Sequence, residues 1–257
     1  MKILLAHGIL GFGSTRILES IALGNYFNGV AAHLEGHKVD QPSVNRIGSI
    51  KARGDELKRE ILGTALGPGE RLHVIAHSMG GLDMRYALSD SRVADRVATL
   101  VTIGTPHKGS PVADAIFQRT GPLFTECPPF LRKELESHAD GLRELTTPFL
   151  EGFNRDFEEP KGRIRYIAVA GDAAAAGSEL LLFRFAAVLG GVTGETNDGV
   201  VTKSSALRDD YEHRPLWPSD HAGEIGWTSP LIWRRFFPAT SHLARYDELV
   251  REIANGV

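Results

Sequence analysis

The chain is poor in several features that would assign it to a particular class of protein. Its 257 residues contain one cysteine, Cys127, which excludes an internal disulfide and a cysteine-based metal cluster. Lysine plus arginine (29) nearly balances aspartate plus glutamate (32), so no basic excess is available to bind nucleic acid or an anionic membrane. No apolar run reaches the length of a membrane span. Nucleic-acid partners and integral membrane segments are therefore not expected, and the oligomeric state is left open.

What is present is the composition of a soluble globular protein, with 42% hydrophobic and 24% charged residues. Met1–Gly8 places one lysine before apolar residues, but this apolar part is too short for a signal-peptide core. We therefore expect a cytoplasmic protein, and a secreted mature form whose signal was removed is the alternative.

The stretch Leu72–Gly81 contains the most informative motif, L-H-V-I-A-H-S-M-G-G. An apolar run ends abruptly at small residues around Ser78, which is typical of a buried strand, a sharp turn and the start of a helix. The pattern fits the nucleophile elbow G-x-S-x-G with Ala76 in place of the first glycine. Small residues are needed because the serine lies in a strained conformation and the strand and helix press against the turn. Ser78 is therefore the candidate nucleophile; a tight turn with an incidental serine is the alternative.

Apolar and amphipathic segments alternate along the chain. The segments typical of strands are Lys2–Ala6, Val30–Leu34, Arg71–His77, Arg96–Ile103 and Arg163–Ala170. Those typical of helices are Arg16–Phe27, Ser49–Leu66, Gly81–Leu88 and Ser178–Leu189. The charged residues of the second helix, Arg53 among them, are interpreted as a mostly solvated face. The alternation predicts a mostly parallel sheet with helices on both faces, in one α/β domain over residues 1–257.

Residues 111–157 interrupt this alternation, because their apolar residues lie among prolines and glycines without a clear period. We interpret the stretch as a helical cap inserted within the domain; an ordinary connecting pair of helices is the alternative. The turn His7–Gly13 follows the first strand and is rich in glycine, so its backbone N–H groups can face a ligand. Its H-G dipeptide recurs at this position in esterases and lipases, and we interpret it as half of an oxyanion hole; a flexible loop is the alternative.

A nucleophilic serine needs a histidine to take its proton and a carboxylate to orient that histidine. The expected order along the chain is serine, acid, histidine, which leaves three histidines near the C-terminus. His221 lies in a loop and is our choice. His242 opens the predicted terminal helix, and His213 lies in a polar stretch that is expected at the surface.

Two aspartates compete for the role of acid. Asp198 stands in T-N-D-G-V-V, a turn followed by β-branched residues that we expect to re-enter the sheet, and it ranks first. Asp172 directly follows the strand Arg163–Ala170 and ranks second. Asp220 is too close to His221 in sequence to be its expected partner.

With these residues, the chain resembles bacterial triacylglycerol lipases, especially those of the Pseudomonas/Burkholderia type. The matching segments are spread in order over nearly the whole chain: His7–Gly11, Ala76–Tyr86, Thr102–Asp114, Leu142–Thr147, Asn197–Val201 and Asp220–Ile225. The resemblance implies an α/β-hydrolase fold with Ser78 as nucleophile, Asp198 as acid and His221 as base.

The resemblance also implies parts of the site that the residues alone do not give. Ile9 and Met79 would supply the backbone donors of the oxyanion hole, and a mobile lid would lie within roughly Ala113–His138. The apolar residues assigned to substrate binding on this basis are Leu10, Phe117, Phe124 and Leu131.

Two departures from these lipases bear on metal binding and compartment. A calcium-ligating aspartate commonly stands two residues after their catalytic histidine, where this chain has Gly223, so calcium is not expected. Secreted members often carry a disulfide cysteine where this chain has Lys203–Ser205, and Cys127 has no partner, which fits a reducing compartment. No cofactor is expected. The first elbow residue, Ala76, matches the form found in small Bacillus-type lipases.

The expected function is hydrolysis of carboxylic esters, as a lipase or carboxylesterase that prefers medium to long acyl chains. The expected partners are a small lipid or ester substrate and, through the lid, transient contact with a lipid interface. Two alternatives stay open. One is transfer of the acyl group to another alcohol, or thioester cleavage, by the same residues; the other is a catalytically silent lipid-binding protein of the same fold.

Overall fold

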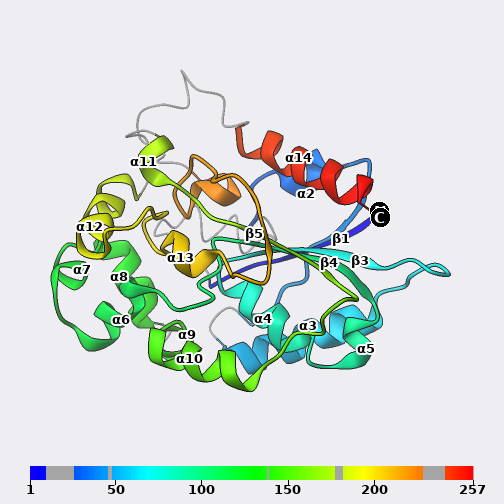
Figure 1. The fold of residues 1–257 in the computed structure, drawn as a ribbon, viewed down its shortest axis with the longest axis horizontal. Coiled ribbons are helices and arrows are strands. Elements are labelled where there is room, and N and C mark those ends of the chain that lie inside the picture. Colours follow the sequence, from blue (N-terminus) through cyan, green and yellow to red (C-terminus); the bar gives the residue numbers. More distant parts are fainter. Residues whose placement is uncertain (10–25, 46–47, 138, 177–181, 228–240, 257) are drawn as a thin grey trace.

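The computed structural model describes residues 1–9, 26–45, 48–137, 139–176, 182–227 and 241–256 (Figure 1). Within these residues a six-stranded sheet runs in the order β2-β1-β3-β4-β5-β6, with every neighbouring pair parallel. Its strands are β1 (Lys2–Ala6), β2 (Lys38–Asp40), β3 (Leu72–His77), β4 (Val97–Ile103), β5 (Arg165–Val169) and β6 (Glu212–His213). The predicted parallel sheet is confirmed.

The central strands are buried because their sequences are apolar on both faces. All six residues of β3 are buried, as a strand covered by helices on both sides requires. The register places Ala6 beside Ala76, Ala76 beside Thr102, and Thr102 beside Ala168. The carboxyl ends of β1, β3, β4 and β5 therefore meet at one edge of the sheet, and the loops that follow them lie together.

Helices cover both faces of the sheet (Figure 1). One face carries α3 (Ile50–Gly63), α4 (Met79–Ala87) and α5 (Ser91–Ala94), and the other carries α2 (Val30–His33) and α14 (Ser241–Asn255). Helix α3 begins at Ser49, whose side chain accepts the N–H of Ala52, and it buries Ile50, Leu57 and Ile61 along one face.

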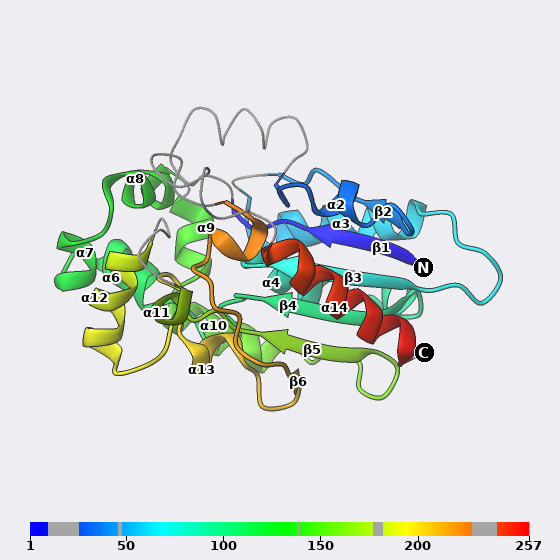
Figure 2. The same cartoon turned by 90° about the horizontal axis from the view of Figure 1, so that it is seen from above.

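A group of short helices lies beyond the carboxyl ends of the strands (Figure 2). Those between β4 and β5 are α6 (Pro111–Gln118), α7 (Pro122–Thr125), α8 (Pro129–Ser137), α9 (Ala139–Glu144) and α10 (Thr147–Asp156). Those after β5 are α11 (Ala173–Ala176), α12 (Phe183–Thr193), α13 (Lys203–Ala206) and the 3₁₀ turn η1 (Gly223–Ile225). None of the helices in the described residues is both long and apolar enough to cross a bilayer.

Three local predictions are corrected or left aside. Val30–Leu34 was predicted as a strand but contains α2, because a short apolar run does not distinguish a strand from a helix. The residues after it contain β2, which was not predicted, because this edge strand is mostly exposed and gives no apolar signal. The predicted helix Arg16–Phe27 lies mostly outside the described residues, and that at Ser178–Leu189 is described only from residue 182, where α12 follows.

Candidate active site

Ser78 lies at the turn between β3 and α4 and has a backbone conformation that serine rarely adopts, with φ 56° and ψ −132°. Its N–H donates to Ile103 O, and its carbonyl accepts the Thr105 hydroxyl at 2.9 Å. The second residue after Ser78 has to be glycine, because a Cβ on Gly80 would lie 2.5 Å from the carbonyl oxygen of Ala6. The elbow thus fixes the serine side chain at the edge where the strands end.

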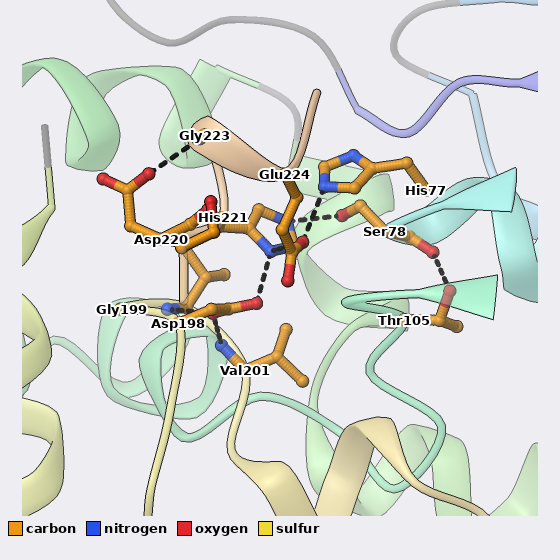
Figure 3. A network of polar contacts seen from close by, with 12 residues as sticks. His77, Ser78, Thr105, Asp198, Gly199, Val201, Asp220, His221, Gly223 and Glu224 are labelled. Carbon is orange, nitrogen blue, oxygen red and sulfur yellow. Dashed lines mark hydrogen bonds and ion pairs between the residues drawn. The ribbon is translucent and has the colours of Figure 1, made fainter. Parts of the chain in front are cut away.

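His221 and Asp198 join Ser78 in one line of hydrogen bonds (Figure 3). His221 Nε2 lies 2.9 Å from Ser78 Oγ, and His221 Nδ1 lies 2.7 Å from Asp198 Oδ2. All three side chains are buried. In this line the serine hydroxyl donates to Nε2 while Nδ1–H donates to the carboxylate, which is the histidine tautomer that can accept the serine proton.

The Asp198 carboxylate is held by the loop that follows it. Its Oδ1 accepts the backbone N–H groups of Val200 and Val201 at 2.8 and 2.7 Å, and its carbonyl accepts the N–H of His221. The prediction that these valines re-enter the sheet is wrong, because their N–H groups bind the carboxylate instead of a neighbouring strand. Oδ2 is thereby left to face His221.

The competing residues have other contacts. Asp172 caps α11, where its Oδ1 accepts the N–H groups of Ala174 and Ala175. His213 is exposed on β6, and His242 binds the carbonyl of Asn28 through Nε2 at 2.8 Å. The structure therefore brings only Asp198 of the two ranked aspartates against His221.

The backbone around Ile9 is fixed at several points. His7 Nδ1 donates to Gly8 O at 2.8 Å, while its Nε2 accepts the N–H of Val44 at 3.2 Å. Arg53 Nη2 donates to His7 O at 2.6 Å. Since Gly8 O and the N–H of Ile9 belong to one peptide plane, these contacts set the direction of the N–H that the sequence assigns to the oxyanion hole. The second assigned residue, Met79, opens α4 directly after Ser78.

Arg53 was predicted on a solvated face, and this is wrong. Its side chain is 0% exposed and donates to Asp83 Oδ2, Asn45 O and His7 O. The missed signal was helical spacing, because Arg53 lies three residues after Ile50 and so shares its buried face.

The residues assigned to substrate binding differ in their surroundings. Leu131 is buried in the apolar cluster that includes Met79, and Phe124 is partly buried against that cluster. Phe117 is 54% exposed on α6. Leu10 lies outside the described residues.

Within the described residues, the carboxyl group nearest to Gly223 is already held by backbone hydrogen bonds. The carboxyl oxygens of Asp220 accept the N–H groups of Leu182 and Gly223, and burial raises the pKa of Asp220 to about 6. Among the described residues, His77, His221 and Glu224 form the one cluster with the side-chain types of a metal site. Glu224 Oε2 lies 3.0 Å from His77 Nε2 and 3.5 Å from His221 Nδ1, and the latter atom also lies 2.7 Å from Asp198 Oδ2. We therefore interpret the cluster as a hydrogen-bond network.

Chelation by EGTA is accordingly expected to leave both the Tm and the rate of the ester hydrolysis expected from the sequence unchanged, because both oxygens of Asp220 already accept backbone N–H groups and Gly223 offers no side-chain oxygen. Thermal scans and steady-state assays with and without excess calcium measure this. A lower Tm in EGTA that added calcium restores would show that other oxygens bind the ion.

Gly104, after β4, has φ 55° and lies directly against the charged part of the site. A Cβ there would lie 3.0 Å from His221 Nδ1 and 3.1 Å from Asp198 Oδ2, and closer still to Glu224 Oε2. Gly104→Ala is therefore expected to lower kcat/KM by about 100-fold through displaced side chains, and to lower the stability by about 2–4 kcal/mol.

The matched control for this change is Gly69→Ala, which has φ 73° but no atom within 4 Å of the new Cβ. This variant has the backbone strain, which lowers the stability by about 1–2 kcal/mol. It lacks the clash, so it should keep full activity. Equal losses of activity in Gly104→Ala and Gly69→Ala would contradict the conclusion that the clash at the site causes the loss.

Parts of the chain are similar in sequence to known proteins. The family described as PGAP1-like alpha/beta domain matches residues 56–162. Triacylglycerol lipase 2 of Saccharomyces cerevisiae is 30% identical over 182 residues, which cover 69% of this chain and 53% of the yeast protein. A triacylglycerol lipase of Vibrio cholerae is 33% identical over 117 residues, which cover 44% of this chain and 35% of that lipase. The chain thus spans about half or less of the length of these curated relatives.

Among solved structures, the mature form of the Bacillus licheniformis lipase BlEst2 superposes with a TM-score of 0.67 at 21% identity, covering 86% of this chain and 84% of that one. This likeness shows the fold, and the predicted α/β-hydrolase fold is confirmed. The chain therefore has an α/β-hydrolase fold, with a segment similar to the PGAP1-like domain and a partial, distant similarity to triacylglycerol lipases.

Proposed function

We propose that the protein hydrolyses carboxylic esters through an acyl-enzyme, with Ser78 as nucleophile, His221 as base and Asp198 as acid. The single observation that carries the proposal is the buried line of hydrogen bonds from Ser78 Oγ through both nitrogens of His221 to Asp198 Oδ2. A protein that only binds lipid has no need for a serine, a histidine and a carboxylate in this order and geometry.

The proposed cycle follows from these positions. Ser78 Oγ attacks the ester carbonyl carbon while its proton passes to His221 Nε2. The negative charge on the carbonyl oxygen is stabilised by the backbone N–H groups of Ile9 and Met79. His221 then gives its proton to the departing alcohol. A water molecule next attacks the acyl carbon while the same nitrogen takes its proton, and that proton passes to Ser78 Oγ as the carboxylic acid leaves. No step requires a cofactor.

The substrate is proposed to be a lipid or another ester with a medium to long acyl chain. Helices α6 to α10 lie beyond the strand ends, within the 111–157 cap that we propose as part of a single domain. They supply apolar side chains to the cluster around Met79, next to Ser78, with Leu131 buried there and Phe124 at its margin. Each CH₂ removed from water contributes about 0.8 kcal/mol, so a longer acyl chain should bind better for as long as further apolar side chains are there to cover it. Exposed Phe117 would contact a lipid interface.

The experiment has two arms. A fluorophosphonate probe is expected to label the protein once, and mass spectrometry should place the label on Ser78. Hydrolysis of p-nitrophenyl esters from acetate to palmitate should give a kcat/KM that rises with chain length. Phe124→Asp should lower the long-chain values and leave acetate unchanged, and exposed Val192→Asp on α12 is the control.

The alternatives predict different outcomes. An acyltransferase or thioesterase would also be labelled, but it would hydrolyse oxygen esters slowly and speed up with an added alcohol or with a thioester. A silent lipid-binding protein would not be labelled. Highest kcat/KM with acetate, unaffected by Phe124→Asp, would mean a short-chain esterase whose cap serves packing alone.

A further inference from the structure

Three buried side chains outside the proposed catalytic set form a chain of hydrogen bonds behind it. His77 precedes Ser78 on β3 and is 0% exposed. Its Nδ1 lies 2.7 Å from the hydroxyl of Tyr26, and its Nε2 lies 3.0 Å from Glu224 Oε2 (Figure 3 shows the Glu224 end). The mechanism above assigns none of these three a role.

The Tyr26 end of the chain touches the oxyanion loop. Burial raises the pKa of Tyr26, and the nearby backbone of Gly8 partly opposes that rise. Gly8 is packed tightly here, since a Cβ on it would lie 2.7 Å from Ser78 Cβ and 3.0 Å from the Tyr26 hydroxyl. Tyr26 therefore contacts the residue whose carbonyl shares a peptide plane with the N–H of Ile9.

The Glu224 end of the chain touches the base. Glu224 Oε2 lies 3.5 Å from His221 Nδ1, and the ring centroids of His77 and His221 are 4.5 Å apart. The chain thus joins the two groups whose placement relative to Ser78 matters most, the oxyanion loop and the base.

The hydrogen positions in the chain follow from charge and from counting partners. Burial and the neighbouring Asp198 and Asp220 raise the pKa of Glu224 well above its usual range, and burial lowers the pKa of His77, which favours the neutral form of both side chains. The direction we infer has Tyr26 O–H donating to His77 Nδ1 and His77 Nε2–H donating to Glu224 Oε2. In this direction the proton of Glu224 lies on Oε1, which has no hydrogen-bond partner among the described residues. Hydrogen bonds aligned in one direction strengthen one another.

We propose that Tyr26, His77 and Glu224 are positioning residues, whose one-way chain of hydrogen bonds fixes the Gly8–Ile9 peptide and the His221 ring relative to Ser78. The proposal rests on the proposed ester hydrolysis. In this proposal Glu224 is a neutral acceptor for the proton on His77 Nε2. The phenol of Tyr26 fixes the oxyanion loop and does not contact the substrate.

The first test is Tyr26→Phe, which keeps the ring and removes only the hydroxyl. We expect kcat to fall roughly 10- to 100-fold with KM unchanged, because the oxyanion donors act on the transition state. The control is Tyr166→Phe, which loses a hydrogen bond to Pro160 O far from the site and should keep its kcat. A Tyr26→Phe enzyme with normal kcat, or with a change confined to KM, overturns the proposal.

The second test separates a neutral Glu224 from a charged one. Glu224→Gln keeps the acceptor oxygen and should stay within about threefold of wild type, with an unchanged acid limb in the pH profile of kcat/KM. Glu224→Leu breaks the chain and should lose as much kcat as Tyr26→Phe. A shift of the acid limb in Glu224→Gln, or equal losses in both variants, would show instead that Glu224 is a charged partner of His221. The titratable and charged groups that face Glu224 in this profile are His77, His221, Asp198, Asp220, Tyr26, Tyr246 and Arg245.

A third readout needs no activity and therefore distinguishes failure of this proposal from failure of the proposed function. In protein labelled with ¹⁵N-histidine, the ring shifts of His77, assigned from the spectrum of His77→Gln, should report a neutral ring with its proton on Nε2 across pH 5 to 8. Tyr26→Phe should change the Nδ1 shift. A cationic ring, or a proton on Nδ1, contradicts the chain even if the protein hydrolyses no ester.

Discussion

Replacing Ser78 by alanine is expected to lower kcat/KM toward p-nitrophenyl esters by roughly 10⁵-fold while the protein stays folded. Without Oγ no acyl-enzyme forms, and what remains is the stabilisation offered by the oxyanion donors and by substrate binding. Alanine keeps the Cβ that already tolerates the φ of 56° at this turn, so the elbow should not collapse. Steady-state kinetics and a thermal scan measure the two effects separately.

The control for this loss is Ser89→Ala, because Ser89 is an exposed serine whose hydroxyl donates to Tyr86 O. It should keep the wild-type rate. If Ser78→Ala kept activity within tenfold of wild type, another residue would have to be the nucleophile, and the proposed function would lose its main support.

Asp198→Asn is expected to lower kcat by about 10⁴-fold. The backbone N–H groups of Val200 and Val201 require an acceptor at Oδ1, so the new amide would keep its oxygen there and turn its NH₂ toward His221. An NH₂ group facing Nδ1 favours the tautomer that carries its proton on Nε2. That tautomer cannot accept the proton of Ser78, and the reaction stalls although the side chain is almost unchanged in shape.

Asp172→Asn tests the same exchange at the aspartate that the sequence ranked second. Its Oδ1 would still accept the N–H groups of Ala174 and Ala175 at the start of α11, so we expect a rate within about tenfold of wild type. The kcat values of Asp172→Asn and Asp198→Asn, measured at saturating ester, test which aspartate is the acid. A larger loss in Asp172→Asn than in Asp198→Asn would overturn the choice of acid.

The fold was predictable where local sequence decides it. Arg71–His77 was expected as a strand, and β3 covers Leu72–His77, because an apolar run that is buried on both faces needs little help from its surroundings. Strand β2 was not predictable, because three mostly exposed residues become a strand only by pairing with β1. Val30 began a helix instead of a strand for a similar reason, since the run it opens is too short to show a period.

The residues of the candidate site were likewise predictable only where local sequence identifies them. Ser78, Asp198 and His221 could be proposed from the sequence because each stands in a short motif, and the structure places their side chains within hydrogen-bond distance. Tyr26 and Glu224 could not be assigned a role, because their importance comes from contacts across 51 and 147 residues of sequence with His77. Such contacts exist only once the sheet has formed.

The parallel arrangement of the strands also determines when, during synthesis of the chain, the candidate site is complete. A ribosome completes the elbow at Ser78 long before it adds Asp198 and His221, which follow the central strands. Until β5 has joined the sheet and the loops after it have closed over the elbow, the serine of a growing chain has neither base nor acid. If the proposed function holds, an incomplete chain is inert toward the esters of the cell that makes it, and its activity begins only with the last part of folding.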